Sequence, residues 1–129
     1  MTITGVMDMC ARVLEGYEKK RKKYFSDREI EGLSPRLVRM IVDARYVAKT
    51  PFVWPKKRRK KGSKIGASNS AHFRGLAVDI RCRTSPKRYR ILAALFKVGF
   101  TRIGVYDRHI HADCDSSLPQ GVVWMGKSK

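Results

Sequence analysis

AVDIRCRTSPKRYRILAALFKVGFTRIGVYDRHIHAD, residues 77–113, determines the fold class of this chain. Its two ends are rich in β-branched residues, and its middle places apolar residues at helical spacing after the Ser85-Pro86 pair. Serine at the N-cap followed by proline is a common start of a helix, and Gly99 lies where such a helix would end. The stretch therefore predicts a strand at 77–82, a helix from Ser85 to about residue 98, and strands within 100–106 and 109–113.

Two further helices are predicted before this stretch. Apolar residues recur at helical spacing within 6–24, and again after the Ser34-Pro35 pair, where the helix extends to about residue 48. PFVW at 51–54 and GVVWMG at 121–126 have the composition of short strands. This order of elements in 129 residues predicts a single α+β domain, in which helices pack on a small antiparallel sheet.

The chain is strongly basic. It has 29 lysines and arginines against 11 acidic residues, which gives a formal net charge of +18. Such a charge predicts a polyanionic partner, for which nucleic acid, an anionic lipid surface and the bacterial cell wall all qualify. The densest basic run, PKKRRKKGSKIG at 55–66, is interpreted as an exposed loop.

Cysteine usage and the N-terminal sequence indicate where the protein is made. The 3 cysteines are widely spaced without a CxxC pair, which excludes a zinc knuckle and argues against a disulfide framework. The N-terminus lacks the unbroken apolar run of a signal peptide, and no apolar run approaches the roughly 20 residues of a membrane span. We therefore expect a protein made in the cytoplasm, with reduced thiols and no membrane span.

All 3 histidines of the chain lie in two short segments that also contain aspartates. In SNSAHFRGLAVDI, residues 68–80, His72 and Asp79 are seven residues apart. Seven residues of a regular helix rise about 10.5 Å, so the two side chains could share an ion only if a loop enters a strand between them. Taken alone, His72 would be an ordinary surface or core histidine, and Asp79 a buried carboxylate with a partner.

The other two histidines, His109 and His111, lie two residues apart in YDRHIHADCD, residues 106–115. If residues 106–113 are extended, these rings point to the same side as Asp107 and Asp113. Two imidazoles and a carboxylate are a donor set of catalytic zinc sites, which keep a fourth position for water. The simpler alternatives are an exposed strand position for His109, a turn cap for Asp107, and an acceptor of backbone hydrogen bonds for Asp113.

SAHFRGLAVDI resembles the SxHxxGxAxD motif of the zinc D-alanyl-D-alanine metallopeptidases and L-alanyl-D-glutamate endopeptidases. These enzymes cut peptidoglycan and include many phage endolysins. HIHAD is similar to their second motif, HxD or HxH, and Trp124 lies where a tryptophan often follows it. YFSDREIEGLSPRLVRMIVDARYVAKTPFV resembles their lead-in, so the resemblance extends from about Tyr24 to Trp124.

The resemblance implies one zinc ion per chain, held at the sheet by His72, Asp79 and His111. It also implies an arginine that binds the substrate carboxylate or the oxyanion, from a segment that follows the PF-V strand. That segment reads SGYR in the family and VWPKKRR here, where Arg59 is the nearest match and Arg58 the second.

The resemblance further implies a general base beside the zinc. Some members carry a carboxylate three residues before the last ligand, a position that is Arg108 in this chain. Asp107 is the first choice because on a strand it would point the same way as His111. His109 is the second choice, and Asp113 either orients a ligand from behind or acts as the base.

The implied function is a zinc-dependent peptidase of peptidoglycan stem peptides, acting as a D,D-carboxypeptidase or as an L-Ala-D-Glu endopeptidase. In this interpretation residues 1–23 form an N-terminal helix with a basic end, and residues 24–129 form the catalytic domain. The protein would be a phage or prophage lysin, made in the bacterial cytoplasm without a signal peptide. After release it would act on the cell wall, where its charge would hold it to anionic wall polymers.

Two alternatives to this function stay open. The basic runs also suit a polyanion-binding or nucleic-acid-binding protein, although aromatic residues do not interleave with them as a stacking platform requires. The second alternative is a relative that binds zinc but is inactive, because the position of the base departs from that of some members.

Overall fold

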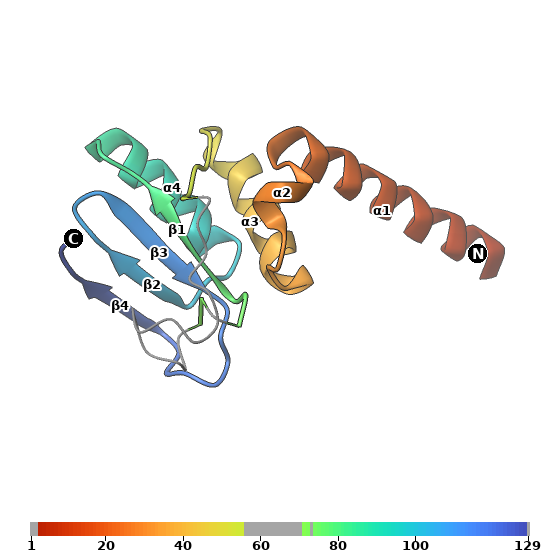
Figure 1. The fold of residues 1–129 in the computed structure, drawn as a ribbon. Coiled ribbons are helices and arrows are strands. Elements are labelled where there is room, and N and C mark those ends of the chain that lie inside the picture. Colours follow the sequence, from red (N-terminus) through yellow and green to blue (C-terminus); the bar gives the residue numbers. More distant parts are fainter. Residues whose placement is uncertain (1–2, 56–70, 73, 129) are drawn as a thin grey trace. The chain divides into compact units, whose positions relative to one another are not determined.

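The computed structural model describes residues 3–55, 71–72 and 74–128. The chain divides into two compact units, Met1–Glu31 and Gly32–Lys129. The first unit contains helix α1 (Ile3–Tyr24) and the short helix α2 (Asp27–Ile30), both drawn in red and orange in Figure 1. The predicted division into a helix at 1–23 and a catalytic domain at 24–129 concerns function and stays a prediction.

The second unit combines two helices with a four-stranded sheet. Its elements in chain order are α3 (Pro35–Ala48), β1 (Ala77–Arg81), α4 (Ser85–Lys97), β2 (Arg102–Val105), β3 (His109–Asp113) and β4 (Val122–Met125). The strands lie in the order β1-β3-β2-β4 (Figure 1). The predicted α+β class is therefore confirmed.

The sheet is mixed, whereas a wholly antiparallel sheet was predicted. β3 is antiparallel to both β1 and β2, but β4 is parallel to β2. After β3 the chain crosses the start of β2, where the N–H of Val122 donates to the carbonyl of Thr101 over 3.0 Å. Because β4 enters beside the first residue of β2, it must run in the same direction.

Alternation along the strands separates a core face of the sheet from an open face. The core face consists of apolar residues that are almost completely buried, among them Val78, Ile80, Ile103, Ile110 and Ala112. Helix α4 packs against β3, and α3 packs against α4. Since successive residues of a strand point to opposite faces, Asp79 and His111 belong to the face that the helices do not cover.

The predicted helix starts are partly correct. Ser34 is the N-cap of α3, and its Oγ accepts from the N–H of Leu37 over 3.1 Å. For α4, however, the N-cap is Thr84 and not Ser85, because the extended backbone of Thr84 lets its hydroxyl accept from the N–H of Lys87. The predicted end of α4 is confirmed, since Gly99 follows the helix with φ of 101°.

The predicted strand at 51–54 is wrong. Residues 51–55 have no regular secondary structure, and a backbone hydrogen bond of 2.7 Å joins the N–H of Arg81 to the carbonyl of Val53. Prolines at 51 and 55 lack the N–H that a strand ladder needs, which explains why the pairing does not extend. The predicted basic loop at 55–66 lies, apart from Pro55, outside the described residues.

A tight turn with Gly75 carries His72 to the start of β1. The carbonyl of Gly75 accepts from the N–H of Ser34 over 2.8 Å, and its N–H donates to the carbonyl of His72 over 3.1 Å. Gly75 has φ of 70°, and a Cβ at this position would overlap the carbonyl oxygen of Gly32. Only glycine therefore fits the turn.

We expect Gly75→Ala to lower the free energy of unfolding by about 2–4 kcal/mol, from backbone strain and overlap together. Gly121→Ala is the matched control, because Gly121 has φ of 69° with no atom within 4 Å of its added Cβ. That variant should lose only the backbone term of about 1–2 kcal/mol. Urea unfolding of both variants measures the difference, and equal losses would contradict the overlap.

Candidate metal centre

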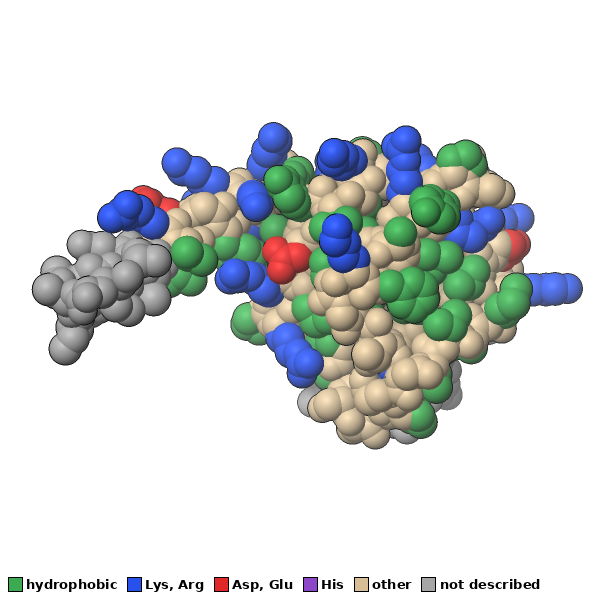
Figure 2. All heavy atoms as spheres, turned by 180° about the vertical axis from the view of Figure 1, so that it is seen from behind, with side chains coloured by type: hydrophobic (Ala, Val, Ile, Leu, Met, Phe, Trp, Pro, Cys, Tyr) green, Lys and Arg blue, Asp and Glu red, His purple; other side chains and the backbone are tan. Residues whose placement is uncertain are grey.

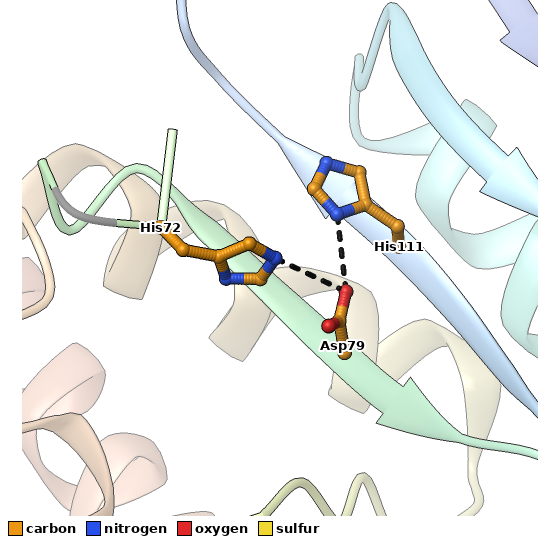
Figure 3. A group of neighbouring side chains, drawn as sticks. All are labelled: His72, Asp79 and His111. Carbon is orange, nitrogen blue, oxygen red and sulfur yellow. Dashed lines mark hydrogen bonds and ion pairs between the residues drawn. The ribbon is translucent and has the colours of Figure 1, made fainter. Parts of the chain in front are cut away.

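His72, Asp79 and His111 converge on the open face of the sheet (Figure 3). His72 comes from the turn before β1, Asp79 lies on β1, and His111 lies opposite Asp79 in the register of β1 and β3. One ligand atom from each residue lies within 4.8 Å of the other two. The structure thus brings together the three residues that the sequence motif predicted as metal ligands, and they form a group that could hold a metal ion.

The geometry of the group fits a small divalent ion. Asp79 Oδ1 is 3.3 Å from His72 Nε2 and 3.0 Å from His111 Nδ1. Two ligands on a tetrahedral ion with bonds of about 2.0–2.1 Å are separated by about 3.3–3.4 Å. The donor atoms would therefore need to move only slightly to coordinate such an ion.

The hydrogen bonds of His111 support a cation at this position. Its Nδ1 faces Asp79, and its Nε2 is 2.7 Å from Asp113 Oδ2. A neutral imidazole has a single N–H and can donate to only one of these two carboxylates. The other nitrogen requires a second proton or a cation, and a metal ion on the Asp79 side satisfies both carboxylates at once.

Hydrogen bonds within the group shift the pKa values of Asp79 and His111. Burial favours the neutral form of Asp79, but hydrogen bonds with His111 and His72 outweigh it and hold the pKa of Asp79 well below its ordinary value. Burial also opposes the charge on His111, yet hydrogen bonds with Asp113 and Asp79 raise its pKa. Protons and a metal ion therefore compete for the same atoms, and metal affinity should fall as pH is lowered.

Asp113 is buried behind His111. Its Oδ2 contacts His111, while its Oδ1 accepts from Arg102 Nε over 2.9 Å and from the N–H of Asp115 over 3.1 Å. Because Asp113 and Asp79 contact opposite nitrogens of one ring, Asp113 lies on the far side of His111 from the other ligands. Of its two predicted roles, this position suits orienting His111 and not acting as the base.

A second buried carboxylate, Asp115, connects the two segments that supply the histidines. Asp115 forms an ion pair with Arg74, which lies in the turn after His72. Its Oδ1 also accepts from the N–H and the hydroxyl of Ser117, over 3.0 and 2.6 Å. Sequence reasoning missed the roles of Arg74, Arg102 and Asp115, and only Asp115 had a signal, the spacing Asp113-x-Asp115 directly after HIH.

His109 lies beside the three ligands without being one of them. Its ring stacks on Tyr106 with 4.3 Å between centroids, and its Nδ1 is 2.9 Å from the hydroxyl oxygen of Ser128. Its Nε2 is then directed toward the group, 4.0 Å from Asp79 Oδ1. Burial lowers the pKa of His109, so the ring is mainly neutral at pH 7 and can accept a proton.

Asp107 lies away from the group. The strand predicted at 109–113 is confirmed as β3, but residues 106–108 do not continue it, so Asp107 does not share the alternation that was considered for 106–113. A hydrogen bond from the N–H of Tyr106 to the carbonyl of His109 closes a two-residue hairpin loop, so that β3 begins only at His109. The exposed carboxylate of Asp107 accepts from the N–H of Ser128 over 2.6 Å, and this backbone hydrogen bond lowers its pKa. Asp107 therefore fixes the segment whose Ser128 hydroxyl contacts His109.

Trp124 forms a wall of the site. Its ring centroid is 5.3 Å from that of His111, and its Nε1 donates to the hydroxyl of Tyr106 over 3.0 Å. A side chain on Gly104 would overlap this indole ring. The predicted substrate-binding residues Arg58 and Arg59 lie outside the described residues.

No protein-family model matches the chain, and neither a curated protein nor a solved structure matches it. Among the helices in the described residues, none is long and apolar enough to cross a membrane. The class that fold and site define is an α+β protein with a His/Asp/His group, on the open face of its sheet, that could hold a metal ion.

Proposed function

We propose that the chain is a zinc-dependent peptidase that cleaves the stem peptides of peptidoglycan. The observation that carries the proposal is the convergence of His72, Asp79 and His111, with their ligand atoms within 4.8 Å of one another. These are the three positions at which the sequence resembles the ligands of the peptidoglycan metallopeptidases. Two imidazoles and a carboxylate suit zinc, as do the short distances between them.

Zinc on these three residues would supply an activated water nucleophile and polarise the carbonyl of the scissile bond. A residue of the chain would transfer the proton. His109 Nε2 is directed toward the group and can accept a proton from the nucleophile and return it to the leaving amine. Tyr106 and Ser128 hold the ring of His109 in that orientation.

A mainly apolar pocket adjoins the group. Its volume is about 110 Å³, and Leu33, Trp54, His72 and Asp79 are among the residues that line it. Such walls favour an uncharged part of the substrate. The alanine side chains that both candidate reactions of the resembled family have next to the scissile bond are compatible with this pocket.

Replacing His109 with glutamine should lower kcat by about 10²–10⁴-fold, the usual contribution of a general acid-base group. Zinc content should stay at the wild-type level, because His109 is not one of the three ligands. Steady-state kinetics and metal analysis of the same preparation check both statements. Asp107→Asn is the comparison at the position predicted first from the sequence, and a larger loss of kcat there would contradict the role of His109.

The experiment that tests the function uses zinc-loaded protein and a synthetic stem pentapeptide that ends in D-Ala-D-Ala. We expect cleavage that a chelator abolishes and added zinc restores, and mass spectrometry of the products identifies the bond. A protein that binds one zinc ion but cleaves nothing would be an inactive relative. A protein that binds no zinc but binds nucleic acid in a salt-sensitive way would contradict the peptidase altogether.

The charge of +18 would hold the enzyme to anionic wall polymers, as expected of a lysin that acts on the wall after release. On the face of the second unit seen in Figure 2, the lysine and arginine side chains of the described residues are scattered and not gathered in one patch. Such a distribution suits attraction to an extended polyanion. Binding to purified cell walls should therefore weaken as salt is raised, and binding that is unchanged by salt would contradict the tether.

A further inference from the structure

A second, larger cavity adjoins the His/Asp/His group and shares Pro55 and Asp79 with the pocket lined by Leu33 and Trp54. Its volume is about 330 Å³, and its lining includes Asp79 and His109 together with three arginines, Arg81, Arg83 and Arg108. No part of the proposed chemistry uses these arginines. The cavity nevertheless shares Asp79 and His109 with the site where that chemistry would occur.

The fold places the three arginines together for reasons of strand geometry. Arg81 follows Asp79 by two residues on β1 and therefore points to the same open face, opposite His109 in the register. Beyond β1, the N–H of Cys82 donates to the carbonyl of Arg108 over 2.9 Å. This hydrogen bond holds the segment with Arg83 against the hairpin loop with Arg108.

The guanidinium groups of this cavity are available to an anion. Within residues 3–55, 71–72 and 74–128, no ion pair joins Arg81 or Arg83 to a carboxylate. Arg108 Nε lies 4.0 Å from Asp107 Oδ2, with both side chains more than half exposed. Asp79 is the one carboxylate that lines the cavity among the residues that the structure describes. It is also a candidate ligand, and a cation on the His/Asp/His group would offset its charge.

We propose that Arg81, Arg83 and Arg108 form a subsite that binds a carboxylate of the substrate close to the scissile bond. The inference rests on the proposed function and specifies its substrate class. A guanidinium matches a carboxylate with two parallel hydrogen bonds. Because Asp79 and His109 line the same cavity as the three arginines, a carboxylate bound there would lie close to the bond that is cut.

The test measures binding without cleavage. The full-length zinc-loaded protein is titrated with N-acetyl-D-alanine, and the arginine Nε–Hε resonances are followed by NMR. We expect saturable shifts of the resonances of Arg81 and Arg83. N-acetyl-D-alaninamide, which lacks the carboxylate, should leave the resonances of Arg81 and Arg83 unshifted. Equal shifts with the two probes would overturn the proposal.

A double variant provides the second measurement. Arg81→Gln with Arg83→Gln should raise the Kd for N-acetyl-D-alanine by about tenfold or more, through loss of charge-assisted hydrogen bonds. Lys87→Gln with Arg90→Gln removes the same charge from exposed positions of α4 that do not line the cavity, and should bind as the wild type does. An equal rise in Kd for both double variants would mean that the loss of net charge alone weakens binding, and this would overturn the subsite.

The source of the carboxylate is determined with a third probe. N-acetyl-D-glutamine carries the free α-carboxylate and the γ-amide of the γ-linked D-glutamate in a stem peptide. Tighter binding of N-acetyl-D-alanine supports a C-terminal carboxylate and hence a carboxypeptidase, whereas tighter binding of the third probe supports an internal carboxylate and hence an endopeptidase. If the probes bind but no stem peptide is cleaved, the proposed function fails and the subsite stands; if cleavage occurs but neither carboxylate binds, the subsite fails alone.

Discussion

Replacing His111 with alanine is expected to remove zinc binding and any peptidase activity together. His111 supplies one of three ligand atoms, and its side chain is only 13% exposed, between Asp79 and Asp113. Its loss takes a ligand directly from the ion, so zinc affinity should fall by well over the about 10–100-fold that loss of an outer partner causes. Two ligands then remain, which is fewer than a catalytic zinc site uses.

Metal analysis and competition with a chelator of known affinity measure this effect in the purified variant. His109→Ala is the matched control, because it removes a neighbouring histidine of β3 whose Nε2 is 4.0 Å from Asp79. That variant should keep about one zinc ion per chain. If His111→Ala binds zinc as tightly as the wild type, the metal centre is not the one described.

Replacing Asp113 with alanine should affect stability and zinc binding at the same time. The carboxylate is 1% exposed and contacts His111, Arg102 and the N–H of Asp115. Its removal leaves the guanidinium of Arg102, itself 12% exposed, without this partner. Breaking a buried ion pair in this way costs about 3–5 kcal/mol, and zinc affinity should fall about 10–100-fold because His111 is no longer oriented.

Urea unfolding in the presence of a chelator measures the stability term without any contribution from zinc, and competition experiments then measure the metal term. Asp107→Ala is the control, since Asp107 is exposed in the hairpin loop and bonded to Ser128, at the other end of β3 from Asp113. It should change the free energy of unfolding by about 1 kcal/mol or less. Equal losses in the two variants would contradict the buried network around Asp113.

Sequence patterns predicted most of the elements of the second unit. The Ser34-Pro35 pair marked the start of α3, and Gly99 marked the end of α4. These signals are local, because a cap or a positive φ depends on a few adjacent residues. The strand predicted at 51–54 was wrong because its apolar composition could not reveal how few donors two flanking prolines leave for pairing.

The candidate site was predictable only in part, because some of its contacts join residues that are distant in sequence. His72, Asp79 and His111 could be selected from motif and residue type, and the structure brings them together. Spacing in the sequence could not decide which neighbouring residue, Asp107, His109 or Asp113, acts as the general base. Alternation along an assumed strand put Asp107 beside His111, but the two-residue hairpin loop breaks that alternation and leaves His109 there instead.

The sequence by itself therefore determined the α+β class, the main helix boundaries and the identity of the three candidate ligands. Periodicity, caps and donor chemistry are properties of short segments, and they are readable without knowing what packs against them. Only the tertiary structure decided that Asp113 and Asp115 support the site from behind, and that Arg81, Arg83 and Arg108 share a cavity beside it. Those arrangements depend on the register between β1 and β3 and on the turn that joins β2 to β3, which bring together residues distant in sequence.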